Sequence, residues 1–149
     1  MKRYRLLLAV FLILLIGGCN DAPAGTVVVE GAWGRPSPQG APTTAFYMTI
    51  ENSSSQDDVL LEVRINNCET VEIHRTSIDE GGVMRMAPVA GGQIVVAAGE
   101  SVILAPGDLH LMCIGLAQPF TGGQQVPLTA VFADSGDIAV TAEIRQEAP

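Results

Sequence analysis

Short strand-like runs recur along this sequence about every ten residues, and each run ends at a turn signal. Val, Ile, Thr, Phe and Tyr are prominent in the runs, as at residues 44–50 and 126–132, whereas Gly, Pro, Asn and Asp separate them. No stretch shows the period of a long amphipathic helix. Many short strands at this spacing are typical of a β-sandwich or β-barrel. The pattern therefore predicts one all-β domain, long enough to bury a real core.

The expected elements can be assigned by residue range. Strands are predicted at residues 26–30, 44–50, 59–65, 70–74, 93–97, 101–104, 109–114, 126–132 and 138–144. Residues 31–38 hold two glycines and two prolines and are predicted to form a loop. Residues 134–137 are predicted to turn a hairpin.

The first 18 residues have the composition of a lipoprotein signal peptide. Basic residues precede the apolar run 6–16, which at 11 residues is too short for a comfortable membrane span. Cys19 then follows Leu-Ile-Gly-Gly, which is similar to a bacterial lipobox, so cleavage would leave a lipidated Cys19 at the new N-terminus. The alternatives are an ordinary signal peptide cut nearby and an uncleaved anchor.

This interpretation divides the chain into a signal peptide (1–18), a tether (19–25) and a β-sandwich domain (26–149). It predicts a domain in the cell envelope, in the periplasm or on the outer face of a membrane, held by a lipid anchor. Thiols can oxidise in such a compartment.

Removal of the signal peptide also changes the charge. It takes away the single lysine and two of the arginines, which leaves five arginines against 16 acidic residues and moves the formal charge from −8 to −11. Phosphate groups of nucleic acids are bound by clustered basic side chains, so no nucleic-acid partner is expected. An acidic surface can steer a cation or simply keep the protein in solution.

Both histidines of the chain lie near methionines. His110 and Met112 are two residues apart in a strand-like run, where residues i and i+2 point to the same face. His74 ends another such run, and Met84 and Met86 form a second pair with the same spacing. A single Met or His is usually a packing or hydrogen-bonding residue, but this clustering favours a binding site. Imidazole and thioether together form a borderline-to-soft ligand set that suits Cu(I).

Motifs for catalysis are scarce in the sequence. It contains no Gly-x-Ser-x-Gly and no phosphate-binding loop, and its carboxylates are scattered. Because an enzyme needs an activated group and none can be nominated, we expect a protein that is not an enzyme.

Three segments carry a family resemblance, namely the Val-Glu-Ile-His of residues 71–74 and the runs 82–89 and 104–112. Together with residues 32–36 and 45–50, they resemble the PCuAC family of periplasmic copper chaperones. The resemblance implies a cupredoxin-like Greek-key β-sandwich that binds Cu(I) through two His and two Met. It also implies transfer of copper to an acceptor, either a cytochrome c oxidase subunit with its copper A centre or another copper chaperone.

Carried over position by position, the resemblance makes four residues the copper ligands: His74, Met86, His110 and Met112. Met84 lies where the family varies and is expected to be an auxiliary or packing residue. Some members place another methionine soon after the first histidine. Arg75 and Thr76 stand there in this chain, which removes that optional ligand and predicts a positive charge near the site.

Cys68 and Cys113 leave three alternatives open. In an oxidising compartment such a pair is first of all a disulfide candidate, and buried free thiols and an auxiliary copper ligand are the alternatives. Cys113 follows Met112 and should face away from it, whereas the turn signal Asn66-Asn67 leaves the orientation of Cys68 undecided. Two other classes of protein also remain: an electron-transfer cupredoxin, which needs a thiolate beside its His and Met ligands, and a metal-free structural sandwich.

Overall fold

The computed structural model describes residues 25–37 and 40–148. Its strands are β1 (Val27–Gly34), β2 (Thr43–Asn52), β3 (Asp58–Arg64), β4 (Cys68–Ile78), β5 (Met84–Pro88), β6 (Ile94–Val96), β7 (Ser101–Leu104), β8 (Leu109–Leu116), β9 (Gln125–Phe132) and β10 (Gly136–Ile144), with a short 3-10 helix η1 (Ala90–Gly92). Within these residues no helix is long and apolar enough to cross a membrane. The predicted Cys19 lipidation site, signal peptide and most of the tether lie outside the described residues.

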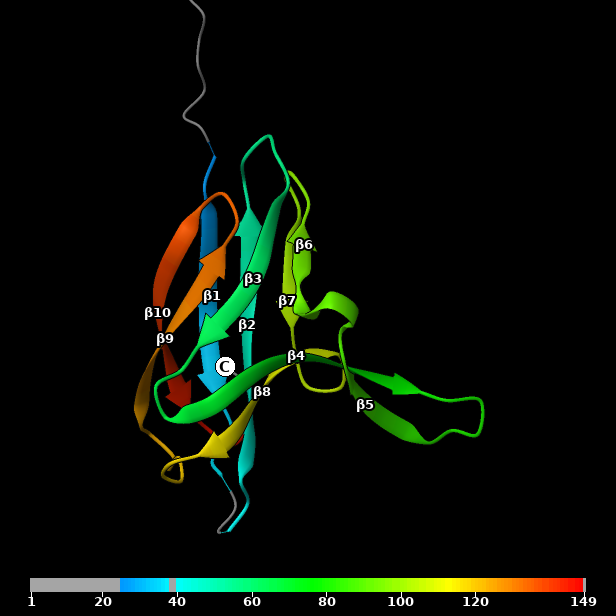
Figure 1. Cartoon of the computed structure of the whole chain (residues 1–149), viewed down its shortest axis with the longest axis vertical. Coiled ribbons are helices and arrows are strands. Elements are labelled where there is room, and N and C mark those ends of the chain that lie inside the picture. Colours follow the sequence, from blue (N-terminus) through cyan, green and yellow to red (C-terminus); the bar gives the residue numbers. More distant parts are fainter. Residues whose placement is uncertain (1–24, 38–39, 149) are drawn as a thin grey trace, which may run out of the picture.

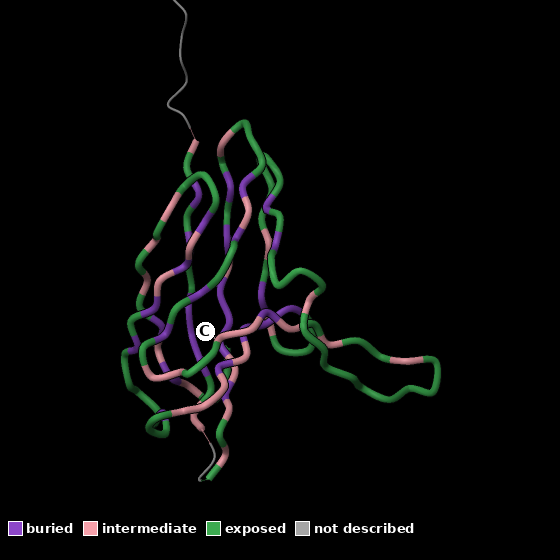
Figure 2. Tube along the Cα trace, viewed as in Figure 1, coloured by how far each residue is buried: buried purple, intermediate pink, exposed green. Residues whose placement is uncertain are grey.

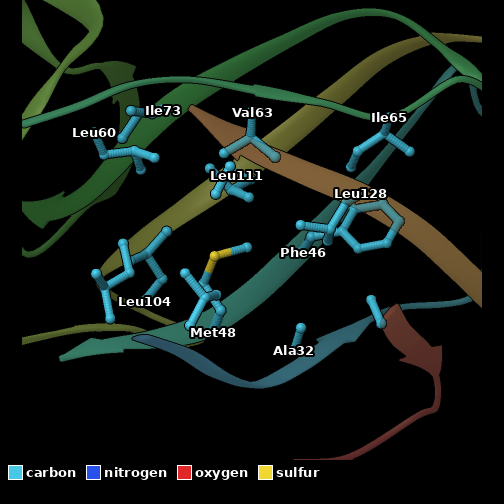
Figure 3. Close-up of a cluster of buried hydrophobic side chains, with 14 of the residues drawn as sticks. Ala32, Phe46, Met48, Leu60, Val63, Ile65, Ile73, Leu104, Leu111 and Leu128 are labelled. Atoms are coloured by element: carbon cyan, nitrogen blue, oxygen red, sulfur yellow. The ribbon is translucent and has the colours of Figure 1, made fainter. Parts of the chain in front are cut away.

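The strands form one hydrogen-bonded sheet in the order β5-β4-β8-β2-β1-β10-β9-β3-β6. β7 lies off this path and pairs with the second half of β2, whereas β8 pairs with the first half. This sheet folds over on itself around a shared core (Figure 1). Figure 3 shows side chains of β3, such as Leu60 and Val63, on the opposite side of the core from Met48 of β2 and Ala32 of β1. The predicted all-β sandwich is confirmed.

The predicted loop at residues 31–38 is wrong in its first half, because β1 continues to Gly34. Gly31 has a positive φ of 59°, and the pairing with β2 shifts register between Glu30 and Trp33. Gly31 thus allows a β-bulge, which bends the strand without ending it. Beyond the bulge, Ala32 and Trp33 are buried. The strand therefore ends later than the glycines and prolines of this segment had suggested.

β4 and β8 are adjacent strands with two different faces. Leu111 and Cys113 of β8 and Ile73 of β4 belong to the buried core. The alternate residues, among them His110 and Met112, therefore point away from that core. Alternation thus places apolar packing on one face of these strands and the predicted ligands on the other.

The hairpin of β4 and β5 projects from the body of the sandwich (Figure 1). All five residues of β5 are exposed, and Figure 2 shows the outer part of the hairpin as almost entirely exposed. Asp79 organises its turn: Oδ1 accepts hydrogen bonds from the backbone N–H of Gly81 (3.0 Å) and Val83 (2.9 Å), and Oδ2 accepts one from Nε of Arg85 (2.7 Å). These bonds hold the pKa of Asp79 below its usual value.

Candidate metal site

Strand register brings the predicted ligands onto one face of three neighbouring strands. His74 of β4 pairs directly with His110 of β8, and Glu72 pairs with Met112. On the other edge of β4, Thr76 pairs with Met86 of β5 and Ile78 with Met84. Directly paired residues share a face, so imidazoles and thioethers from three segments lie side by side across β8, β4 and β5.

His110 enters the site from a tight turn and is almost completely buried, with 3% of its surface exposed. Gly107 takes a positive φ of 86° in this turn, and the N–H of Asp108 donates to the carbonyl of Ala105 (3.2 Å). The carbonyl oxygen of Asp108 lies 2.9 Å from Nδ1 of His110. Since a carbonyl can only accept, Nδ1 carries the proton and Nε2 keeps its lone pair.

His74 has the opposite hydrogen-bond arrangement. Its Nε2 lies 2.8 Å from Oε2 of Glu72, which is two residues away on the same face. Its Nδ1 is buried and has no hydrogen-bond partner. The side chain of His74 is 13% exposed, whereas that of Glu72 is 41% exposed. His74 therefore has one buried imidazole nitrogen without a hydrogen-bond partner.

A pocket of about 290 Å³ is lined by Met84, Met86, His110 and Met112, whereas His74 is not among its lining residues. Arg35 and Tyr47 complete much of its wall. The ring centroid of Tyr47 is 6.4 Å from that of His110 and 4.4 Å from that of Trp33. The pocket is thus lined by methionine side chains, the aromatic ring of Tyr47 and the buried imidazole of His110.

The donor atoms of this face fit a soft metal ion. The ring centroids of His74 and His110 are 5.9 Å apart. A metal ion bonded at about 2 Å to one nitrogen of each ring would hold the centroids roughly 6 Å apart, so the pair can share one ion. Within residues 25–37 and 40–148, no three His, Cys, Asp or Glu side chains gather closely enough to hold a metal ion. Methionines line the adjoining pocket, and thioether sulfur is a ligand type that favours Cu(I).

Cys68 and Cys113 are joined by a disulfide, with Cα atoms 5.5 Å apart. Cys113 faces the core, away from Met112, and has no exposed surface. The alternation of β4 is irregular next to Cys68, where Glu69 and Thr70 are both exposed. This irregularity turns Cys68 toward Cys113 and away from the face that carries His74 and His110.

The two hairpin methionines occupy similar positions. Met84 and Met86 share a face and line the same pocket, and both are exposed, at 65% and 57%. Met86 is nearer to His74 in register, because it pairs with Thr76 whereas Met84 pairs with Ile78.

The expected positive charge beside the ligands is not supplied by Arg75. That residue pairs with Leu109 and Ala87, so it lies on the face of β4 opposite to His74. Alternation within a strand is the physical reason. Arg35 of the segment after β1 lines the pocket instead.

Sequence reasoning also missed the partners of the two imidazoles. Glu72 is two residues from His74, and the carbonyl that binds His110 belongs to Asp108, again two residues away. The spacing of Glu72 could have revealed it, because residues i and i+2 of a strand share a face. The backbone carbonyl of Asp108 leaves no trace in residue type and could not have been predicted.

Comparison with known proteins agrees with this architecture. The apo PCuAC domain from PmoF1 is 21% identical with a TM-score of 0.69, covering 85% of this chain and 98% of that domain. The copper-bound PCuAC domain from PmoF2 is 21% identical with a TM-score of 0.68, covering 85% and 97%. CuI-DR1885 from Deinococcus radiodurans is 23% identical with a TM-score of 0.61, covering 88% and 84%. The fold is therefore that of PCuAC domains, and the predicted cupredoxin-like β-sandwich is confirmed.

The sequence comparisons match proteins described as putative lipoproteins. "Putative lipoprotein Lxx21020" from Leifsonia xyli subsp. xyli (strain CTCB07) is 26% identical over 122 residues, which cover 82% of this chain and 71% of that protein. The family model described as "Putative lipoprotein LpqE-like" matches residues 27–144. This match spans all ten strands of the described sandwich, from β1 to β10. The chain belongs to the LpqE-like family.

Proposed function

We propose that this protein is a metallochaperone that binds one Cu(I) ion and passes it to another protein. The observation that carries the proposal is the direct pairing of His74 with His110 beside a pocket lined by Met86 and Met112. Two imidazoles and two thioethers are neutral ligands, so the bound ion would keep its single positive charge. Thioethers also favour Cu(I) over Cu(II).

The similar solved structures support copper as the cargo. One is a copper-bound PCuAC domain and another is a Cu(I) form of DR1885. We assign the same cargo to the present chain because its two histidines and nearby methionines occupy one face of the same fold. It assigns no catalytic group to the protein.

The exposed hairpin supports a role in transfer as well as binding. Met86 is 57% exposed on β5, whereas His110 is almost completely buried. A ligand on an exposed edge can be replaced by a ligand of an incoming protein while the buried imidazole still holds the ion. The proposed acceptors are a cytochrome c oxidase subunit, at its copper A centre, and a further copper chaperone. Both follow from the PCuAC resemblance.

We further propose that the protein acts in the cell envelope, attached to a membrane by a lipid on Cys19. The lipobox-like segment before Cys19 and the name of the Leifsonia relative, a lipoprotein, support this location. A periplasmic or outer-face location would also suit the disulfide, since disulfides persist in oxidising compartments.

An electron-transfer cupredoxin is less consistent with the described residues. A blue-copper site needs a cysteine thiolate as a ligand. Cys68 and Cys113 are bonded to each other, so neither sulfur is a thiolate while the disulfide is intact.

An anaerobic Cu(I) titration against a competing chelator, with the full chain purified in detergent, tests the proposal. We expect one Cu(I) per chain and no blue absorption when Cu(II) is added. A metal-free structural sandwich would take up no copper, and a blue protein would favour electron transfer. Loss of uptake in the His110→Ala variant, with circular dichroism unchanged, would link the binding to this site.

A further inference from the structure

The two histidines of the site have opposite hydrogen-bond partners on their rings. His110 has Nδ1 2.9 Å from the carbonyl oxygen of Asp108, and His74 has Nε2 2.8 Å from a carboxylate oxygen of Glu72. Both partners are acceptors, and a neutral imidazole has one N–H donor and one lone pair. The proton therefore lies on Nδ1 in His110 and on Nε2 in His74. The lone pairs lie on Nε2 of His110 and Nδ1 of His74.

The other tautomer of His74 would be unfavourable in two ways. It would direct the lone pair of Nε2 at the Glu72 carboxylate, and it would place an N–H at the buried Nδ1, which has no partner. A buried polar atom without a partner carries a free-energy cost. With the proton on Nε2, the same buried position holds a lone pair, and a soft cation can satisfy it.

Glu72 is placed for this role by strand geometry alone. It lies two residues before His74 on the same face of β4 and pairs with Met112 across the strand boundary. Its side chain is 41% exposed, so the carboxylate remains hydrated while it holds the imidazole. A carboxylate that accepts the second N–H of a metal-binding histidine fixes the orientation of the ring and strengthens the ligand.

We propose that Glu72 is a positioning residue that makes His74 bind copper through Nδ1, while His110 binds through Nε2. The inference rests on the proposed Cu(I) function and goes beyond it, because it states which nitrogen of each histidine is the ligand and which residue makes that choice. Glu72 itself does not bind the metal. The two rings would thereby bind one ion through different nitrogens.

Nitrogen-15 NMR of the histidine rings tests both halves of the inference. In the metal-free full chain, in detergent at a pH where both rings are neutral, we expect the Nε2–H tautomer for His74 and the Nδ1–H tautomer for His110. Ag(I) then serves as a diamagnetic probe for Cu(I). Its addition should shift Nδ1 of His74 and Nε2 of His110.

Three results would overturn the inference. An Nδ1–H tautomer of His74 in the metal-free protein would contradict the role of Glu72 before any metal is added. An Ag(I)-induced shift at Nε2 of His74 would contradict the ligand assignment while leaving the proposed copper function intact. No shift in either ring, together with no Cu(I) uptake in the chelator titration, would overturn the inference and the proposed function together.

Two variants of Glu72 separate positioning from charge. Glu72→Gln keeps an oxygen that can accept the Nε2–H, so the tautomer of His74 should persist and Cu(I) affinity should fall less than about 10-fold. Glu72→Leu removes the acceptor, so we expect a mixed tautomer and a 10- to 100-fold loss of Cu(I) affinity, about the range for lost carboxylate partners of metal-binding histidines. Glu100→Leu, in the turn between β6 and β7, controls for the loss of one surface charge. Equal losses in the Gln and Leu variants would show that charge, and not the hydrogen bond, is what Glu72 contributes.

Discussion

His74 of β4 and His110 of β8 are direct cross-strand partners whose ring centroids lie 5.9 Å apart. Two imidazoles at this separation can bind one ion together. Removal of either ring should therefore weaken the binding of every metal ion at this site. We predict that His74→Ala and His110→Ala each lower Cu(I) affinity by more than about 100-fold, above the range for residues that only support a ligand. Weak binding of Cu(II) or Zn(II) should fall as well. Chelator competition measures the affinities, and circular dichroism checks that the variants fold.

The methionines should act differently, because their sulfurs matter only for a soft ion. Met86→Leu and Met112→Leu keep size and apolarity but remove the sulfur, so Cu(I) affinity should fall while weak Cu(II) or Zn(II) binding survives. Met84→Leu is the matched control on the same strand and should change Cu(I) affinity little, because Met84 lies two cross-strand pairs farther from His74 than Met86. Loss of binding in Met84→Leu but not in Met86→Leu would reverse the assignment of the two residues.

The disulfide gives a prediction about stability. Cys68 and Cys113 are 45 residues apart in sequence, and closure of a loop of this size should stabilise the fold by about 4 kcal/mol in the chain-entropy model. The Cys68→Ser/Cys113→Ser double variant should therefore unfold at lower denaturant concentration. Mass spectrometry of alkylated but unreduced protein provides the direct test: two alkylated thiols in freshly isolated protein would contradict the bond.

Asp58 should make the fold sensitive to acid. Asp58 is 3% exposed, and its carboxylate accepts hydrogen bonds from the backbone N–H groups of Val59 (2.7 Å), Asp134 (3.0 Å) and Ser135 (3.0 Å). Burial raises the pKa of Asp58, but the hydrogen bonds from Ser135, Asp134 and Val59 outweigh this effect and hold the pKa below its usual value of 3.8. A lowered pKa stabilises the folded state above the unfolded-state pKa, and this contribution is lost as pH falls through the folded-state pKa.

Asp58→Asn should accordingly lower the free energy of unfolding by about 1–3 kcal/mol at pH 7, because the N–H donors lose their ionised acceptor. The difference from the unaltered protein should start to shrink below about pH 4, where Asp58 becomes protonated in the unfolded chain. It should be lost as pH falls further, through the lowered folded-state pKa of Asp58. Asp137→Asn, which removes an exposed partner of Arg64, is the control and should change the free energy of unfolding by less than about 1 kcal/mol. Urea titrations across this pH range give both values, and a difference independent of pH would contradict the argument.

The proposed lipid anchor depends on one thiol. Cys19→Ser should leave the precursor unprocessed or release the protein from the membrane fraction. Cell fractionation and the mass of the N-terminal peptide measure these outcomes. A variant that is processed normally and stays in the membrane would rule out lipidation at Cys19.

Much of this arrangement could be predicted from the sequence because strands alternate their faces. The spacing of His110 and Met112 was enough to place both on one face of β8, and turn residues marked most strand ends. The bulge at Gly31 was not predictable, since a glycine among prolines suggests a loop unless its hydrogen bonds are known. The same limit applied to Cys68, whose orientation depends on the irregular start of β4.

Contacts between distant segments were the other limit. The direct pairing of His74 with His110 follows from the register of β4 against β8, and register depends on turns and on packing across the whole sandwich. The PCuAC resemblance predicted that these residues meet, but not that they are direct partners or that Glu72 and the Asp108 carbonyl hold their rings. The predicted positive charge of Arg75 beside the site was wrong for a related reason. Arg75 is adjacent to His74 in sequence, but it lies on the opposite face of β4.

The disulfide lies toward one end of β4 and β8, and the histidine pair lies toward the other. It cross-links the two strands that carry His74, His110 and Met112, whereas β5 ends the sheet order and is bonded to β4. The β4–β8 side of the site is therefore covalently constrained, whereas the β5 side is free to move. In the proposed copper transfer, we therefore expect the β5 methionine to dissociate first, so that the acceptor meets an ion still held by His74, His110 and Met112.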